Sequence, residues 1–144
     1  MVNFEWQQEW SVGESAMDET HHEFVVCVNA MLVSDDSGLL GALDTFIEHA
    51  QRHFGEEDRA MSASAYGSAG CHVDEHAAVL NSAFEVRQAL AQGRHDVVRA
   101  FARALADWFP QHASVMDLGL ARWLLQHRLG GAPVVLRPRM AAVA

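Results

Sequence analysis

Apolar side chains recur at spacings of three and four residues through four successive stretches of this chain. An amphipathic α-helix buries one face by this pattern. The spacing predicts four helices, the first capped by Asp18, over residues 18 to about 33, 39 to 61, 71 to 91 and 96 to 129. No useful length of sequence shows the alternation of a half-buried strand. We therefore predict an all-α fold, an antiparallel up-down-up-down four-helix bundle with an irregular N-terminal arm.

The chain has the size and composition of one globular domain. It has 144 residues, of which half are apolar and a fifth charged. The helical pattern predicts a bundle domain over residues 1–129. Residues 130–144 contain a Gly-Gly pair and two prolines without a helical period, so we expect a flexible C-terminal tail there.

Charge and hydropathy exclude several partner classes. A net charge of −9 leaves no basic stripe for nucleic acid. No run of eighteen apolar residues predicts a membrane span, and the start lacks the features of a signal peptide. Cys27 and Cys71 suit a reducing compartment better than a disulfide scaffold, although two thiols are able to pair. We predict a cytoplasmic protein.

Two segments place pairs of metal-binding side chains four residues apart. On an α-helix, residues i and i+4 share one face, with Cβ atoms about 5–6 Å apart. His53 and Glu57 form such a pair in the second helix, and His72 and His76 form one in the third. A histidine pair at this spacing is a recurrent metal-chelating device.

The first and fourth helices supply three further candidates. His21 lies near the start of the first helix. His112 and Asp117 are five residues apart, which is about 140° around an ideal α-helix. This offset suits one ion poorly, but it works if the histidine takes one metal and the aspartate reaches between two. The candidate metal ligands are His21, His53, Glu57, His72, His76, His112 and Asp117.

Five imidazoles and two carboxylates cannot fill two six-coordinate metals unless the carboxylates bridge. A bridged pair of metals with one open position is how a dinuclear site binds a small molecule. Taken singly, a buried histidine is more often a hydrogen-bonded core residue than a ligand. Two i, i+4 pairs in consecutive helices, with a histidine and an aspartate in the fourth, favour a metal site.

Over residues 4 to about 128 the chain resembles the bacterial hemerythrins. Each motif that carries the resemblance is moderately specific, and the ordered set is highly so. The motifs are Trp6-x-x-x-Trp10-Ser-Val-Gly13, Met17-Asp-x-x-His21, His53-Phe-x-Glu-Glu57 with Met61, His72-x-x-x-His76, and Trp108-x-x-x-His112-x-x-x-x-Asp117.

The resemblance implies two non-haem iron ions bridged by Glu57, Asp117 and an oxo or hydroxo group. It implies one six-coordinate iron held further by His72, His76 and His112. The other iron, held by His21 and His53, is then five-coordinate and binds O2 as a hydroperoxide. Imidazole-rich ligation suits iron.

The resemblance also implies a binding protein rather than an enzyme, serving oxygen storage, delivery or sensing. Nitric oxide, peroxide and azide-like anions are further expected ligands. The alternative is a di-iron enzyme with peroxidase, oxidase or nitric-oxide-reducing activity. Carboxylate-rich di-iron oxidases carry two Glu-x-x-His pairs, whereas this chain has only Glu19-x-x-His22. The C-terminal tail is a candidate junction to a signalling partner.

Two positions depart from the family pattern or complicate it. Ala113 stands where the family usually has a bulkier aliphatic residue, so we expect an enlarged O2 pocket. Pro110 is expected to kink the fourth helix and shift His112. Side chains out of phase with the ligands, or away from them, are predicted to lie at the surface or around the ligands: His22, His49, Glu56, His95 and His127.

Overall fold

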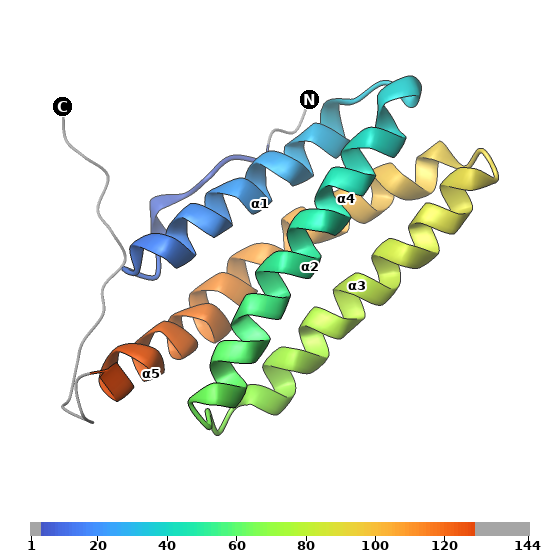
Figure 1. The fold of residues 1–144 in the computed structure, drawn as a ribbon. Coiled ribbons are helices and arrows are strands. Elements are labelled where there is room, and N and C mark those ends of the chain that lie inside the picture. The colour runs from blue at the N-terminus through green and yellow to red at the C-terminus, as the bar shows by residue number, and fades with distance from the viewer. Residues whose placement is uncertain (1–3, 129–144) are drawn as a thin grey trace, which may run out of the picture.

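The computed structural model describes residues 4–128, which form an all-α bundle (Figure 1). The elements in chain order are η1 (Gln8–Trp10), α1 (Ser15–Val33), η2 (Asp36–Gly38), α2 (Leu39–Ala63), α3 (Ala69–Ala91), α4 (His95–Gln111), η3 (His112–Asp117) and α5 (Leu118–Arg128). Two are 3-10 turns, η1 and η2, and η3 is a π-helical turn. The predicted tail, 130–144, lies outside the described residues.

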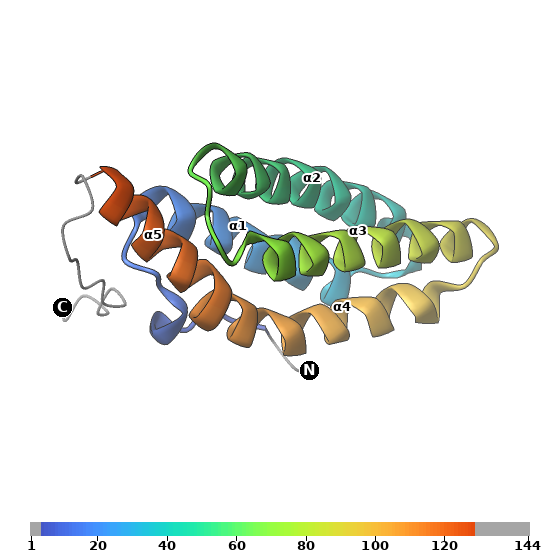
Figure 2. The same cartoon turned by 90° about the horizontal axis from the view of Figure 1, so that it is seen from below.

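Four rods make up the bundle, because α4, η3 and α5 continue one another along the chain (Figure 2). Helix α1 packs against α2 and α4, and α3 packs against the same two helices. Short connections join consecutive rods, which run in opposite directions (Figure 1). The predicted four-helix bundle is confirmed.

Phenylalanine rings fill the core between the rods. Phe24, Phe46, Phe54 and Phe109 are at most 1% exposed. The Phe24 ring stacks on Phe109 with ring centroids 4.7 Å apart, and Phe46 meets Phe24 edge-on at 5.6 Å. Each such buried ring stabilises the fold by about 1.5–3 kcal/mol relative to an exposed one. Phe24, Phe46 and Phe54 occupy apolar positions whose spacing predicted the helices, and Phe109 adds to them from the fourth rod.

The N-terminal arm is held to α1 by two buried or half-buried polar side chains. Asp18 accepts hydrogen bonds from the Ser11 hydroxyl at 2.7 Å and from the Val12 amide at 2.8 Å. Further along α1, the Asn29 side chain accepts from the Phe4 amide at 3.0 Å and donates to the Phe4 carbonyl. The arm therefore has a defined course over the bundle.

The prediction that Asp18 caps the first helix is wrong. Helix α1 begins at Ser15, and its cap is Glu14, whose carboxylate accepts from the Met17 amide at 2.7 Å. Asp18 lies one turn further on, and it is buried because it binds the arm rather than the helix end.

The predicted fourth helix is divided by a π-helical turn. Pro110 lies inside α4 and cannot donate a hydrogen bond to the preceding turn. The π turn follows directly, from His112 to Asp117. A π turn closes hydrogen bonds between residues five apart, so it brings i and i+5 onto one face. The spacing of His112 and Asp117, awkward on an α-helix, matches this turn.

We expect Asp18→Ala to destabilise the fold by about 1–3 kcal/mol. The substitution leaves the buried Val12 amide and Ser11 hydroxyl without their acceptor, and an unpaired buried donor has about this cost. Urea unfolding measures the change. The exposed neighbour, changed as Glu19→Ala, is the control, and equal midpoints for the two variants would contradict the assignment.

Candidate metal centre

The structure brings all seven candidate ligands together in the middle of the bundle. Every rod contributes: α1 one residue, α2 two, α3 two, and the π turn two at its ends. None of the seven is more than 7% exposed. Their side chains fall into two groups that share one glutamate. One group is Glu57, His72, His76, His112 and Asp117, and the other is His21, His53 and Glu57.

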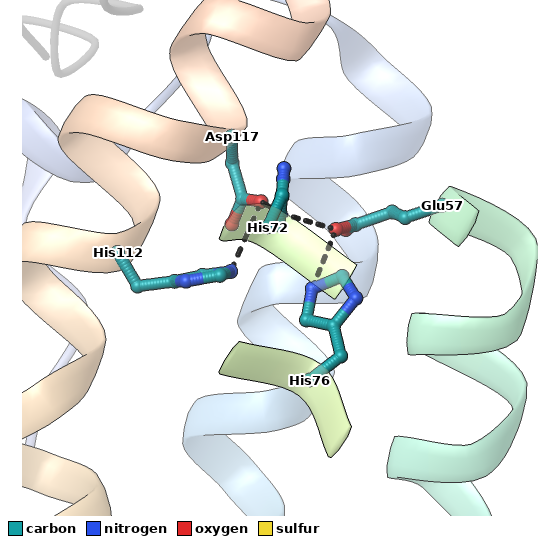
Figure 3. A group of neighbouring side chains, drawn as sticks. All are labelled: Glu57, His72, His76, His112 and Asp117. Carbon is teal, nitrogen blue, oxygen red and sulfur yellow. Dashed lines mark ion pairs between the residues drawn. The ribbon is translucent and has the colours of Figure 1, made fainter. Parts of the chain in front are cut away.

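Glu57 divides its two carboxylate oxygens between the groups. Its Oε1 lies 3.3 Å from Nε2 of both His72 and His76 (Figure 3). Its Oε2 lies 2.6 Å from Nε2 of His53 and 3.7 Å from Nε2 of His21. A carboxylate in this position can bridge two metal ions.

Asp117 divides its oxygens in the same way. Its Oδ1 lies 2.9 Å from Nε2 of His72 and 3.3 Å from Nε2 of His112 (Figure 3). Its Oδ2 lies 3.1 Å from Nε2 of His21. The two carboxylates therefore lie between two sets of histidines. One set is His72, His76 and His112, and the other is His21 and His53.

The donor atoms at the centre lack ordinary hydrogen-bond partners. Among the described residues, the buried atoms without a partner include Nε2 of His21, His72, His76 and His112, Oε1 of Glu57 and both carboxylate oxygens of Asp117. Buried polar atoms are nearly always paired, so a converging set of unpaired atoms needs an explanation. Metal ions satisfy them, and imidazole with carboxylate is a donor set that suits iron.

Two further carboxylates hold histidines of the larger group from outside. Asp58 Oδ1 accepts from His76 Nδ1 at 2.7 Å. Glu75 Oε1 accepts from His112 Nδ1 at 3.0 Å and from the Trp108 indole at 3.0 Å. A hydrogen bond at Nδ1 turns Nε2 toward the centre and fixes the tautomer.

Sequence reasoning missed Asp58 and Glu75. Their only local signal is that each adjoins a candidate ligand, Glu57 or His76. Aromatic rings also hold these two histidines in place. Phe54 stacks on His76 at a centroid distance of 4.1 Å, and Trp108 stacks on His112 at 4.2 Å.

Two comparisons with known proteins agree with this geometry. The family model for the hemerythrin HHE cation binding domain matches residues 12–124. A bacteriohemerythrin from Ralstonia nicotianae is 35% identical over 126 residues, which cover 88% of this chain and 92% of that protein. This chain belongs to the hemerythrin family. The resemblance inferred from the motifs is thereby confirmed.

In this hemerythrin a third histidine lies beside the smaller group. His49 is 4% exposed, so it is not a surface residue. Its ring centroid is 5.3 Å from that of His53, and its Nδ1 faces Glu23 and Arg52, each at 3.5 Å. Burial lowers the pKa of His49 to about 4, with help from positive charge on His53 and Arg52. His49 is therefore neutral at physiological pH.

The other side chains predicted to be non-ligands lie outside both groups. His22 is exposed and stacks on Trp6 at a centroid distance of 3.9 Å. His95 lies 3.9 Å from Asp36, and His127 packs against Trp123.

A cavity of about 140 Å³ adjoins the smaller group of the hemerythrin site. It touches His53 and Glu57, and its other walls are mostly apolar. The remaining lining residues are Ala16, Met17, Thr20, Glu56, Ala60, Leu120 and Leu124.

The expectation that Ala113 enlarges the O2 pocket stays a prediction. Ala113 is fully buried in the hydrophobic core and does not line the cavity. Ala113 therefore packs in the core, and other residues form the walls of this cavity.

Two general features of this hemerythrin accord with its composition. Both cysteines are free thiols, Cys27 half-buried and Cys71 exposed. Within residues 4–128, no helix has the length and apolar character needed to cross a membrane.

Without metal, the buried carboxylates hold protons on the facing imidazoles. Burial alone lowers the pKa of His21, but Asp117 and Glu57 outweigh it and raise that pKa to about 10. The same balance raises the pKa of His72 to about 9. Burial raises the pKa of Glu57, yet hydrogen bonds from the surrounding histidines hold it well below its usual value. Metal binding must therefore release protons.

We expect metal affinity to rise with pH between about 6.5 and 9. Each proton displaced from His21 or His72 steepens the dependence by up to about tenfold per pH unit. Competition with a coloured chelator at several pH values measures this slope, and a flat profile would contradict the proton assignment.

The metal-free protein should show the opposite trend in stability. A histidine with a raised folded-state pKa stabilises the fold below its unfolded pKa of about 6.5. That contribution disappears as pH rises through 9 and 10, the folded values of His72 and His21. Urea unfolding of metal-free protein should therefore show lower stability at pH 9.5 than at pH 7.

Proposed function

We propose that this protein holds two non-haem iron ions and binds O2 reversibly, for oxygen storage, delivery or sensing. One observation carries the proposal, the division of the Glu57 and Asp117 oxygens between two groups of histidines. Two carboxylates shared in this way make a dinuclear site rather than two separate ones. Family membership supports iron as the metal.

The histidines divide unequally between the two metal positions. We assign His72, His76 and His112 to the position that the shared carboxylates complete, called here the three-histidine position. His21 and His53 belong to the two-histidine position, and a metal ion held there would keep one coordination site open. An oxo or hydroxo group is proposed as the third bridge. Iron held there in the ferrous state would supply the electrons for reversible O2 binding.

The size and polarity of the cavity limit which ligands can reach the two-histidine position. At about 140 Å³ it is well below the 300–1,000 Å³ of pockets for organic ligands. Its largely apolar wall suits small neutral molecules. O2 and nitric oxide fit this description, as do peroxide and azide as small anions for an oxidised, more positive centre.

The relative's name, bacteriohemerythrin, agrees with a binding protein. We also propose a cytoplasmic location, which the two free thiols support because thiols persist in reducing compartments. The proposed signalling role of the tail concerns residues outside those described.

The purified protein should contain two irons per chain and, when oxidised, show oxo-to-iron charge-transfer absorption. Stopped-flow mixing of the ferrous protein with O2 should then give an oxygenated species that reverts when O2 is removed. Immediate and irreversible conversion to the diferric form would contradict reversible binding. Iron-free protein after reconstitution would contradict the site itself.

A peroxidase is the second candidate function, and Glu56 is the observation that favours it. Apart from the proposed ligands, Glu56 is the one ionisable side chain in the described cavity wall. A carboxyl group there is placed to exchange protons with a bound peroxide.

Under this alternative, multiple turnovers of an electron donor with peroxide should occur and fall by about 10²–10⁴-fold in Glu56→Gln. Glu48→Gln, an exposed change on the same helix, is the matched control. No turnover in the unaltered protein would remove the peroxidase function and leave O2 binding untouched.

A further inference from the structure

The two metal positions differ in how many donors they offer. Around the three-histidine position, five donor atoms from five residues lie within 4.8 Å of one another. Around the two-histidine position, the corresponding group has three residues, and Asp117 adds Oδ2 at 3.1 Å from Nε2 of His21. A first metal ion is expected to bind more tightly at the position where more donor atoms already lie close together.

The positions also differ in how firmly their histidines are held, because two of the three histidines at the three-histidine position, His76 and His112, have an outer carboxylate partner, whereas His72 has none. Asp58 on α2 accepts from His76 on α3, so this hydrogen bond crosses between rods. Because a carboxylate only accepts, His76 carries a proton on Nδ1, and its Nε2 faces Oε1 of Glu57 at 3.3 Å. His76 is thereby oriented before any metal arrives.

Glu75 does the same for His112 across a different pair of rods. One oxygen, Oε1, accepts from His112 Nδ1 in the π turn and from the Trp108 indole in α4, both at 3.0 Å. The Trp108 ring also covers the His112 ring, with an angle of 27° between their planes. His112 is therefore fixed in tautomer and in rotation, although the helix geometry changes just there.

Neither histidine of the two-histidine position has such a partner. Nδ1 of His21 and Nδ1 of His53 make no hydrogen bond to any described residue. The neighbour of His53 is the ring of His49, in place of a carboxylate. This position adjoins the cavity of about 140 Å³ through His53, while His112 lines a separate pocket together with Glu75 and Trp108.

We propose that the metal positions fill in order, the three-histidine position first, and that Asp58 and Glu75 are positioning residues that set this order. The proposal rests on the proposed function in that it takes the centre to hold two metals. A chain with one metal bound then carries it between α2, α3 and the π turn, and leaves the two-histidine position exchangeable.

Calorimetric titration of metal-free protein with Zn²⁺ tests the order without oxygen chemistry. Two steps are expected, each of one ion per chain, with the first the tighter. In protein labelled with ¹⁵N-histidine, the first equivalent should shift the imidazole signals of His72, His76 and His112 before those of His21 and His53. A first equivalent on His21 and His53, or simultaneous filling, would overturn the proposal.

Variants separate positioning from mere folding. Asp58→Asn and Glu75→Gln should weaken the first step by about 10–100-fold and leave the second nearly unchanged. Glu75→Leu, which removes the acceptor as well as the charge, should weaken the first step more than Glu75→Gln. Glu85→Gln, exposed on the same helix, is the matched control. Thermal unfolding of each metal-free variant confirms that it folds.

A final variant distinguishes this proposal from the proposed function. His53→Ala should abolish the second step and retain the first. If the unaltered protein binds one ion or none, the dinuclear site fails. If it binds two with equal affinity, or if Asp58→Asn and Glu75→Gln leave the first step unchanged, only the order and its cause fail.

Discussion

Two buried carboxylates, Glu57 and Asp117, impose the arrangement on which the rest of the centre depends. An ionised carboxylate away from water is costly unless other groups compensate its charge. Here five imidazoles compensate it, and no rod of the bundle can supply all five. Each rod must therefore present its histidines at one level, and each carboxylate lies between the two groups of histidines.

The π turn reconciles this requirement with a continuous fourth rod. His112 and Asp117 have to reach the same centre from one helix, and an α-helix would turn them apart by about 140°. Widening one turn brings them to one face while α5 continues the rod. The irregularity follows Pro110, where the hydrogen-bond ladder is already interrupted.

Sequence patterns predicted the features that depend only on the geometry of a single α-helix. The helical periods gave the rods, and the i, i+4 spacing placed His53 with Glu57 and His72 with His76, because both follow from α-helix geometry. The π turn could not be predicted that way, since the pattern assumes a uniform helix. Asp58 and Glu75 were missed because their partners lie on neighbouring rods, whose relative rotation no local spacing records. The burial of His49 depends on the same rotation.

Because every rod donates at least one side chain, a bound metal pair would act as a cross-link among all four. Separating any one rod from the bundle removes a ligand, so a partly unfolded chain cannot keep the complete centre. Retention of both metals would then report that the whole bundle is closed. Unfolding of the bundle would then be coupled to release of metal, although the chain contains no disulfide among its described residues.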